Sequence, residues 1–341
     1  MTLRVRDLDE SGLLARIVPL LPTGAATLVG PGDDAAVVAA PDGRYVVSTD
    51  VLVEDFHFRH RWSTGYDVGV RAAAQNLADV AAMGGRPTAL VVGLAMPGDL
   101  EVAWVEGLAR GLADACSPVG AAVVGGDLSG GSVVMVSVAV HGDLGGRPPV
   151  LRSGARPGDV VAHAGVRGRS AAGLALLEAG AASPGDGAPG AAGPLAPFVT
   201  GFLRPAPPLD QGPAANAAGA TAMLDVSDGL LRDAGRIAAA SGVVVDLERG
   251  ALQPYVAELL PAAAALGDAA DRASDRALAR ALTWVLAGGE DHGLLATFPP
   301  DVTLPDGFTR LGAVRPADPA AGVTLDGMPP QTSPGWDHFH Q

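Results

Sequence analysis

Short runs of β-branched residues alternate along the chain with longer stretches rich in alanine and leucine. Runs of the first kind are typical of strands, and stretches with apolar residues every three to four positions are typical of helices. In the first half, the pattern predicts strands at Arg44–Thr49, Ala89–Leu94, Ala121–Val124 and Val133–Val140. It predicts helices in the same half at Asp67–Met83 and Glu101–Cys116.

The second half repeats the alternation. The predicted strands are Asp159–Ala164, Thr221–Val226, Val243–Leu247, Gly293–Phe298 and Phe308–Val314. The predicted helices are Ser170–Ala179, Gly229–Ala240 and a helical stretch at Ala263–Leu286. Because strands and helices are mixed in both halves, we expect an α/β protein with mixed sheets and two domains.

Two segments break both periodicities. His141–Asp159 is dense in Gly, Pro and Arg, and we place a domain boundary within it, which gives domains 1–148 and 149–341. The chain of 341 residues has a suitable length for about two domains. Ala182–Pro197 is a low-complexity segment, which we expect to be a mobile surface loop.

Charge and composition exclude several classes of protein. The net charge is −14, and therefore we expect no nucleic-acid partner, which would usually require a basic face. The sequence contains no lysine, and all 23 basic residues are arginines. A Walker A loop, a protein-kinase site and a pyridoxal-phosphate enzyme each need a lysine, so all three are excluded.

Hydropathy and cysteine content indicate the cellular context. No apolar run is long enough to span a bilayer as a helix, and the charged N-terminal residues do not resemble a signal peptide. We expect a soluble, cytoplasmic protein without a membrane partner. The one cysteine, Cys116, excludes an internal disulfide and a cysteine-based zinc site, and we expect it to be a small buried apolar residue.

Acidic residues recur at the ends of predicted strands and in glycine turns. The segments are GPGDD, STD, QNLAD, VVGGD, LDVSD and GGED, and they contain Asp33, Asp34, Ser48, Thr49, Asp50, Asp79, Gly126, Asp127, Asp225, Ser227, Asp228 and Glu290. Carboxylates that converge at strand ends repel one another unless cations join them. Mg²⁺ prefers such hard oxygen ligands and often shares them with phosphates. The adjacent glycines allow the backbone to approach a phosphate closely.

Each segment alone also has a purely structural interpretation. GDD is a common turn, SDG before a helix is a common N-cap, and GGD after a strand can be a plain loop. Asp79 is harder to explain in this way, because an ionised carboxylate on an apolar helix needs a partner. The joint occurrence of the segments, in a chain without a lysine-based phosphate site, favours a shared metal–phosphate site.

The order of the motifs identifies a family. GPGDDAAVV, VVSTDVLVEDFHF, QNLADVAAMGG, VVGGDLSGG, LRSGARPGD, LDVSDGLLRD, LAGGEDHG and GWDHF, from about Gly30 to Phe339, resemble thiamine-monophosphate kinases. These belong to a superfamily with aminoimidazole ribonucleotide synthetase. The resemblance implies an N-terminal α/β domain that dimerises through its sheet, a C-terminal α/β domain and an active site in the cleft between them.

Residue roles are also implied by the resemblance. The implied magnesium ligands are Asp34, Ser48, Thr49, Asp50, Asp79, Asp127, Asp225 and Asp228, with Asp50, Asp79 and Asp127 also expected to be catalytic. The implied ATP contacts are Gly126, Asp127, Arg152 and Ser227, and the implied substrate contacts are His57, Glu290 and Trp336. The chain departs from the family at His292 and Gly293, where an aromatic and an acidic residue often follow GGED.

The implied activity is ATP-dependent phosphorylation of thiamine monophosphate to thiamine diphosphate by direct in-line transfer with several magnesium ions, in a homodimer. Three alternatives remain open from the residues. They are another enzyme of the aminoimidazole ribonucleotide synthetase-like superfamily, a metal-dependent phosphatase, and a non-catalytic nucleotide-binding protein. Selenophosphate synthetase is disfavoured because it requires a reactive Cys or selenocysteine in an N-terminal glycine-rich loop.

Overall fold

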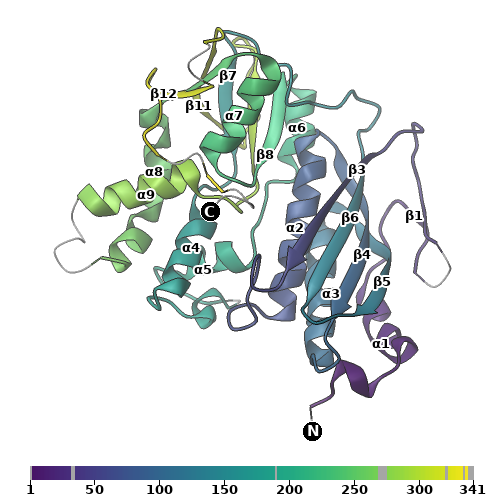
Figure 1. Cartoon of the computed structure of the whole chain (residues 1–341). Coiled ribbons are helices and arrows are strands. Elements are labelled where there is room, and N and C mark those ends of the chain that lie inside the picture. The colour runs from purple at the N-terminus through teal and green to yellow at the C-terminus, as the bar shows by residue number, and fades with distance from the viewer. Residues whose placement is uncertain are drawn as a thin grey trace. The chain divides into compact units, whose positions relative to one another are not determined.

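The computed structural model describes residues 2–31, 35–188, 190–267, 275–318, 322–332 and 335–336. The chain divides into two compact units (Figure 1). Unit 1 comprises Met1–Ala81 and Gly85–Pro148, and unit 2 comprises Ala82–Gly84 and Pro149–Gln341. Both units combine sheets with helices, so the predicted α/β class is confirmed.

Unit 1 is built on a four-stranded sheet in the order β3-β6-β4-β5. Its strands are β3 Val46–Val53, β4 Arg86–Met96, β5 Ala122–Gly130 and β6 Met135–Asp143. β6 is antiparallel to β3 and β4, whereas β5 is parallel to β4. A separate strand pair and three α-helices complete the unit, namely β1 Thr27–Val29, β2 Val37–Val38, α1 Glu10–Ile17, α2 Gly65–Ala82 and α3 Val102–Cys116.

A capping contact defines the start of helix α2, and a glycine allows the helix to pack closely on α3. Thr64 precedes the helix, and its backbone N–H and hydroxyl both donate to the Asp67 carboxylate, at 2.9 and 2.6 Å. This pairing satisfies donors that a helix N-terminus leaves open. A Cβ on Gly69 would lie 2.2 Å from the carbonyl oxygen of Leu108 in α3. The two helices therefore pack with their backbones in contact, and only glycine fits there.

Unit 2 contains a six-stranded sheet in the order β12-β9-β11-β7-β10-β8. Its strands are β7 Val160–Ala164, β8 Ala222–Val226, β9 Val244–Leu247, β10 Gly293–Phe298, β11 Phe308–Arg315 and β12 Val323–Leu325. Its helices are α4 Arg169–Glu178, α5 Ala196–Leu203, α6 Gln211–Ala217, α7 Leu230–Ser241, α8 Arg249–Ala265 and α9 Asp275–Ala287. A large apolar cluster joins the sheet to α7, α8 and α9 and forms the core of this unit.

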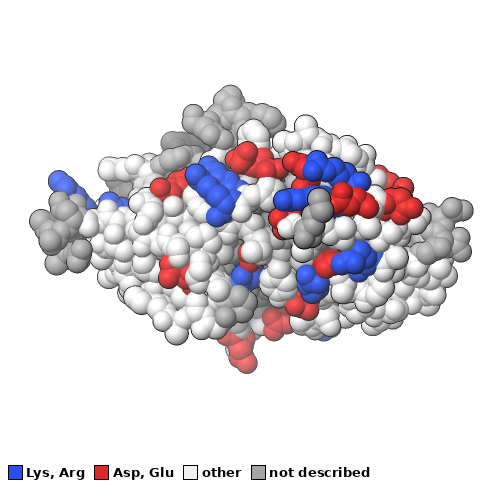
Figure 2. Space-filling model, turned by 90° about the horizontal axis from the view of Figure 1, so that it is seen from below, with Lys and Arg blue, Asp and Glu red and all other residues white. Residues whose placement is uncertain are grey.

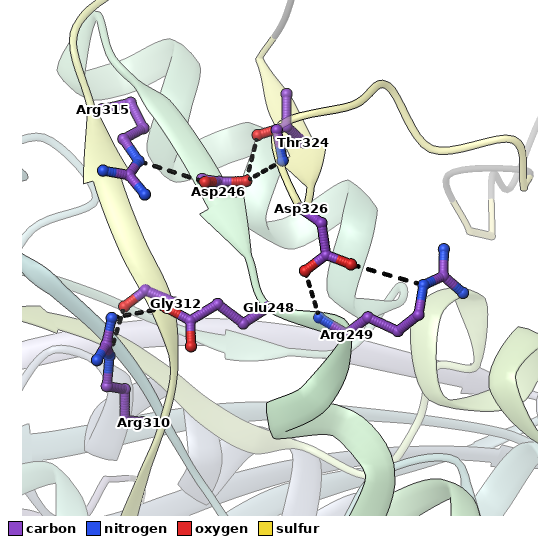
Figure 3. Close-up of polar contacts among 9 residues, drawn as sticks. Asp246, Glu248, Arg249, Arg310, Gly312, Arg315, Thr324 and Asp326 are labelled. Carbon is purple, nitrogen blue, oxygen red and sulfur yellow. Dashed lines mark hydrogen bonds and ion pairs between the residues drawn. The ribbon is translucent and has the colours of Figure 1, made fainter.

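The edge strand β12 is fastened to β9 by polar contacts (Figure 3). The Asp246 carboxylate of β9 accepts bonds from the Thr324 hydroxyl at 2.7 Å and the Gly327 N–H at 2.9 Å, and it pairs with Arg315 at 3.3 Å. These hydrogen bonds and the arginine charge outweigh burial and lower the pKa of Asp246. β12 has only three residues, so side-chain contacts supplement a short ladder.

Two predicted segments differ from the structure. The helical stretch predicted at Ala263–Leu286 is wrong as a single element, because α8 ends at Ala265 and α9 begins at Asp275. Pro254 and Pro261 lie inside α8, and prolines argue against a helix in any sequence pattern. The segment predicted as a surface loop, Ala182–Pro197, includes the 3₁₀ helix η4, Pro184–Gly187, and parts of it pack against the core.

Surface charges are arranged in mixed groups. Figure 2 shows acidic and basic side chains next to one another on the face that it presents. Ion pairs between exposed side chains include Arg4–Glu101 at 3.4 Å and Arg310–Glu248 at 2.6 Å. Such exposed pairs contribute about 0–1 kcal/mol each to the free energy of unfolding. We therefore attribute most of the stability to packing of the apolar cores. None of the described helices is both long and apolar enough to cross a membrane.

Candidate active site

In unit 1, strand β3 and helix α2 bring two candidate ligands into contact. The Ser48 hydroxyl donates to the Asp79 carboxylate at 2.6 Å. Ser48 comes from β3 and Asp79 from the last turns of α2, so the contact joins sheet to helix. Asp79 is half-buried within a helix whose other residues are mostly buried. Oxygen atoms of a hydroxyl and a carboxylate are suitable ligands for Mg²⁺.

Strand register separates the candidates of unit 1 between the two faces of the sheet. Asp50 lies opposite Val138, and that row continues through Val92 to Gly126. Val138 and Val92 are buried, so this row faces the helices, and Ser48 shares its face because strand side chains alternate. Asp127 lies in the next row and therefore points to the opposite face.

That opposite face is exposed in the single chain. Its row runs from Asp127 through Gly93 and Ser137 to Val51. Thr49 belongs to the same face, and its hydroxyl donates to the Val138 carbonyl at 2.8 Å. Within unit 1, Ser48 thus contacts Asp79, and Asp50 lies on the same face of the sheet, whereas Thr49 and Asp127 lie on the other face.

A cavity of about 900 Å³ lies in unit 1 beside Gly125, Gly126 and Asp127. Its walls come from α1, α3, β4, β5 and the segment 35–45, and they are mainly alanine, valine and leucine. A Cβ on Gly126 would lie 2.1 Å from the Val92 carbonyl oxygen, so only glycine fits at this position. An apolar cavity with few polar groups is typical of a small-molecule site.

His57 lies in a tight turn after β3. Its Nδ1 accepts a hydrogen bond from the Val53 N–H at 3.0 Å, which assigns the proton of a neutral ring to Nε2. Asp55 in the same turn has a φ of 66°, which is unusual for a residue other than glycine. The neighbouring Phe56 is 79% exposed. Asp33 and Asp34 lie outside the described residues.

In unit 2, the turn from β8 to α7 carries the second set of candidates. Asp225 is buried at the end of β8, and His292 Nδ1 lies 3.1 Å from its carboxylate. An ionised carboxylate can only accept, so His292 donates this bond. Asp228 pairs with Arg236 at 2.5 Å, and its backbone N–H donates to Asp233 at 2.9 Å.

The GGED loop is attached to this turn. The Glu290 N–H donates to the Ser227 carbonyl at 2.8 Å, and a Cβ on Gly289 would lie 2.2 Å from the same oxygen. Glu290 and His292 have φ values of 68° and 54°. Non-glycine residues adopt such values only where their surroundings fix them, and such strain is common at functional sites.

Asp291 connects the GGED loop to the start of α4. Its carboxylate accepts bonds from the backbone N–H groups of Gly168 and Ser170 at 2.6 and 2.8 Å, at the start of α4. Burial raises the pKa of Asp291, and the charge of Arg167 opposes that shift. Arg167 is itself fully buried and donates to the Gly288 carbonyl at 2.8 Å. Glu290 is therefore held between two fixed neighbours.

The remaining candidates of unit 2 lie at the surface. Trp336 is 47% exposed, and its backbone N–H donates to the Asp228 carbonyl at 2.9 Å. A Cβ on Gly335 would lie 2.1 Å from that same oxygen, so Gly335 and Trp336 contact the β8–α7 turn. Arg152 is exposed, and its carbonyl accepts a bond from Ser241 at 3.0 Å.

No complete metal site is formed by the described residues alone. Within the described ranges, no group of three or more His, Cys, Asp or Glu side chains could hold a metal ion. The donor types nevertheless fit magnesium, because the candidates supply hydroxyl and carboxylate oxygens and neither thiolate nor thioether. Ser48 and Asp79 already touch, which shows that two such donors converge in unit 1.

Comparison with known proteins decides the family. The profile of the family "AIR synthase related protein, N-terminal domain" matches residues 32–144. A thiamine-monophosphate kinase of Mycobacterium tuberculosis is 45% identical over 335 residues, which cover 98% of this chain and 93% of that protein. The chain belongs to the thiamine-monophosphate kinase family.

Solved structures of this family are also similar. Thiamine-monophosphate kinase from Stenotrophomonas maltophilia K279a has a TM-score of 0.73 and 28% identity, covering 93% of this chain and 95% of that chain. AaThiL complexed with AMPPCP and TMP has a TM-score of 0.70 and 29% identity, covering 99% of this chain and 100% of that chain. The expected fold and the prediction of an enzyme, a phosphotransferase of the thiamine-monophosphate kinase family, are confirmed.

Sequence reasoning did not identify the charged side chains that support the candidate ligands. Arg167, Asp233, Arg236 and Asp291 support the β8–α7 turn and the GGED loop, yet none was predicted to do so. Asp233 and Arg236 occupy α7 at the spacing of one helical turn, which is an available signal for an i,i+3 pair. Arg167 and Asp291 lie over a hundred residues apart in the chain, and no local pattern joins them.

Proposed function

We propose that this protein transfers the γ-phosphoryl group of ATP to thiamine monophosphate and so produces thiamine diphosphate and ADP. The observation that carries the proposal is similarity over nearly the full chain to proteins named thiamine-monophosphate kinase, one of them 45% identical. A similar solved structure holds an ATP analogue, AMPPCP, together with TMP. The sequence motifs occur in the same order as in thiamine-monophosphate kinases.

The reaction we propose is a direct in-line transfer. A phosphate oxygen of thiamine monophosphate forms a bond to the γ-phosphorus, and the bond from that phosphorus to the β,γ-bridging oxygen breaks, so ADP leaves. A phosphate monoester has a second pKa of about 6, so its oxygen is already deprotonated at pH 7. No aspartate therefore needs to act as a general base, and catalysis consists of positioning and charge stabilisation.

The proposed adenine site is the cavity of unit 1. Gly126 and Asp127 line that cavity, whose apolar walls suit an adenine ring. Ser227 stands just before α7, where backbone N–H groups at a helix start favour a phosphate. Arg152 is exposed and would add a positive charge. These four are the proposed nucleotide contacts.

Several magnesium ions would be held by Asp34, Ser48, Thr49, Asp50, Asp79, Asp127, Asp225 and Asp228. When bound, magnesium offsets the repulsion between the two phosphorylated reactants, which amounts to about 4 kcal/mol for one pair of unit charges ~4 Å apart at an effective dielectric of 20. The protein's part is to hold oxygen ligands in fixed positions. The Ser48–Asp79 hydrogen bond and the fastening of Asp225 by His292 do this in the two units.

Thiamine monophosphate would contact His57, Glu290 and Trp336. The half-exposed indole of Trp336 offers a flat face to the cationic thiazolium or the aminopyrimidine, a contact worth about 1–2 kcal/mol when desolvated. His57 presents an Nε2–H donor because its Nδ1 is engaged by Val53. Glu290 is fixed by its bond to Ser227.

We also propose a homodimer formed through the exposed face of the unit 1 sheet. Two neighbouring rows of this face carry Val51 with Gly93 and Ala139 with Val91, and Val51 and Val91 are 42% and 37% exposed. Small apolar residues on a continuous sheet face are costly in water and suit a second copy. Asp127 lies on the same face, so dimer formation would enclose it.

The proposal predicts that Asp79→Asn abolishes production of thiamine diphosphate from ATP and thiamine monophosphate, because a proposed metal ligand is lost. The loss should exceed about a hundredfold in kcat, as for removal of other transition-state contacts. Asp114→Asn in α3 is the matched control, because Asp114 is exposed and its carboxylate accepts a hydrogen bond from the Tyr66 hydroxyl at 3.0 Å. Equal activity of Asp79→Asn and the control, with both folded by circular dichroism, would refute the assignment.

A further inference from the structure

Arg236 connects two carboxylates at the start of α7. Its Nη2 lies 2.5 Å from Asp228 Oδ2 and its Nη1 lies 2.5 Å from Asp233 Oδ1. The side chains differ in exposure, with Asp233 completely buried and Arg236 35% exposed. The guanidinium thus has one nitrogen on a fully buried carboxylate and the other on a carboxylate that is 15% exposed.

Asp233 is fixed independently of Asp228's side chain. Its second carboxylate oxygen accepts the Asp228 backbone N–H at 2.9 Å, and its own N–H donates to the Gly229 carbonyl at 3.0 Å. Burial raises the pKa of Asp233 to about 6, and the charges of Asp225 and Asp228 add to that shift while Arg236 opposes it. Arg236 therefore supplies positive charge to both Asp228 and Asp233.

Asp228 has two partners under the proposed function. It is a proposed magnesium ligand, and it is the ion-pair partner of Arg236. A guanidinium and a divalent cation compete for the same carboxylate oxygen, and each repels the other at short distance. If Asp228 held a divalent cation, Nη2 of Arg236 would lose its carboxylate partner and could bind another anion.

We propose that Arg236 exchanges Asp228 for a phosphate group of ATP when a divalent cation binds, and that it is thus a further nucleotide-binding residue. This inference rests on the proposed function. Asp233 keeps the guanidinium at the β8–α7 turn through Nη1 during the exchange. Ser227, a proposed ATP contact, belongs to that same turn, so a phosphate would lie near the released Nη2. A planar guanidinium suits phosphate oxygens, and this chain has no lysine for the task.

Arg236→Gln tests the exchange with two measurements that move in opposite directions. Affinity for Mn²⁺ in the absence of nucleotide, measured by electron paramagnetic resonance, should increase about three- to tenfold because a competing positive charge is removed. The KM for ATP should rise about tenfold because a phosphate contact is lost. The KM for thiamine monophosphate should stay within about twofold.

A purely structural role for Arg236 gives a different result. Loss of support for the turn would weaken Mn²⁺ and ATP binding together, and that outcome would overturn the inference. Unchanged Mn²⁺ affinity with unchanged KM for ATP would overturn it as well. Arg249→Gln, on α8 and paired with Asp326 at the surface, is the matched control and should match the wild type in both measurements.

Arg236→Lys covers the case in which Arg236→Gln does not fold. Lysine keeps the charge but cannot bridge two anions with a planar fork, so Mn²⁺ affinity should match the wild type while the KM for ATP rises. A wild-type KM for ATP in this variant would contradict the exchange. Absence of thiamine diphosphate in the wild-type reaction would instead refute the proposed function, whereas the Mn²⁺ measurement would still report on competition for Asp228.

Discussion

Burial determines the chemistry of individual side chains in both units. Cys116 at the end of α3 is completely buried, and burial raises the pKa of its thiol to about 12 from an ordinary value of 9.0. The thiolate, the reactive form, is therefore absent from the folded protein at neutral pH. In unit 2, burial lowers the pKa of Arg167 and raises the pKa of Asp291, and the charge of each group opposes the shift of the other.

Cys116 should not react with Ellman's reagent at pH 8 in the folded protein, and it should react within minutes in guanidinium chloride. Between pH 9 and about 12, the unfolded chain loses the thiol proton while the folded chain keeps it. Stability should therefore fall as pH rises through this window, and the fall should be smaller in Cys116→Ala. Equal labelling rates for folded and unfolded protein would disprove this account of the thiol.

The residues of the candidate site could be predicted from motifs, whereas their hydrogen-bond partners could not. Motif order pointed to Ser48 and Asp79, but only the folded chain brings β3 against α2 so that the two side chains touch. The His292–Asp225 contact joins residues 67 positions apart and requires β8 and β10 to be neighbours. Such contacts depend on strand order, which no local pattern encodes.

At the scale of elements, the packing of α2 on α3 determines where Asp79 lies. Gly69 faces the Leu108 carbonyl, and Gly111 faces the Tyr66 carbonyl, where an added Cβ would come within 2.2 Å in both cases. Backbone atoms cannot move aside as flexible side chains do. The helix that carries Asp79 is thus positioned by Gly69, ten residues before Asp79, and by Gly111 of α3.

Gly69→Ala should destabilise the protein by about 1–3 kcal/mol, because the new methyl group forces two helices apart. Gly235→Ala in α7 is the matched control, since its Cβ would meet nothing closer than Val323 at 3.8 Å. The control should be neutral or more stable by up to about 1 kcal/mol. Chemical denaturation measures both values, and equal effects of the two substitutions would count against this view of the interface.

Element types were easier to predict than element limits and sheet register. Runs such as Ala89–Leu94 indicated strands because β-branched residues dominate them, yet β4 extends over Arg86–Met96. Irregular register at Pro87/Ala89 and Leu90/Val91 shifts its pairing with both neighbours. A shift of one residue moves the side chains of a strand to the other face of the sheet. The sequence therefore could not predict that Asp127 and Asp50 lie on opposite faces.

At the scale of the whole molecule, the proposed homodimer would cover the exposed face of the unit 1 sheet. Val51→Asp should convert the dimer to monomers, because a carboxylate would be buried without a partner. Leu278→Asp in α9 is the matched control, since Leu278 is 46% exposed in unit 2. Light scattering coupled to size exclusion measures both masses, and a monomeric wild type at micromolar concentration would refute the proposed dimer.

The central claim is phosphoryl transfer from ATP to thiamine monophosphate, and product analysis tests it most directly. Purified protein is incubated with ATP, Mg²⁺ and thiamine monophosphate, and thiamine diphosphate and ADP are quantified by chromatography. The account predicts equal amounts of both products, and neither product once the metal is chelated. ADP and free phosphate without thiamine diphosphate, at a rate independent of thiamine monophosphate, would contradict it.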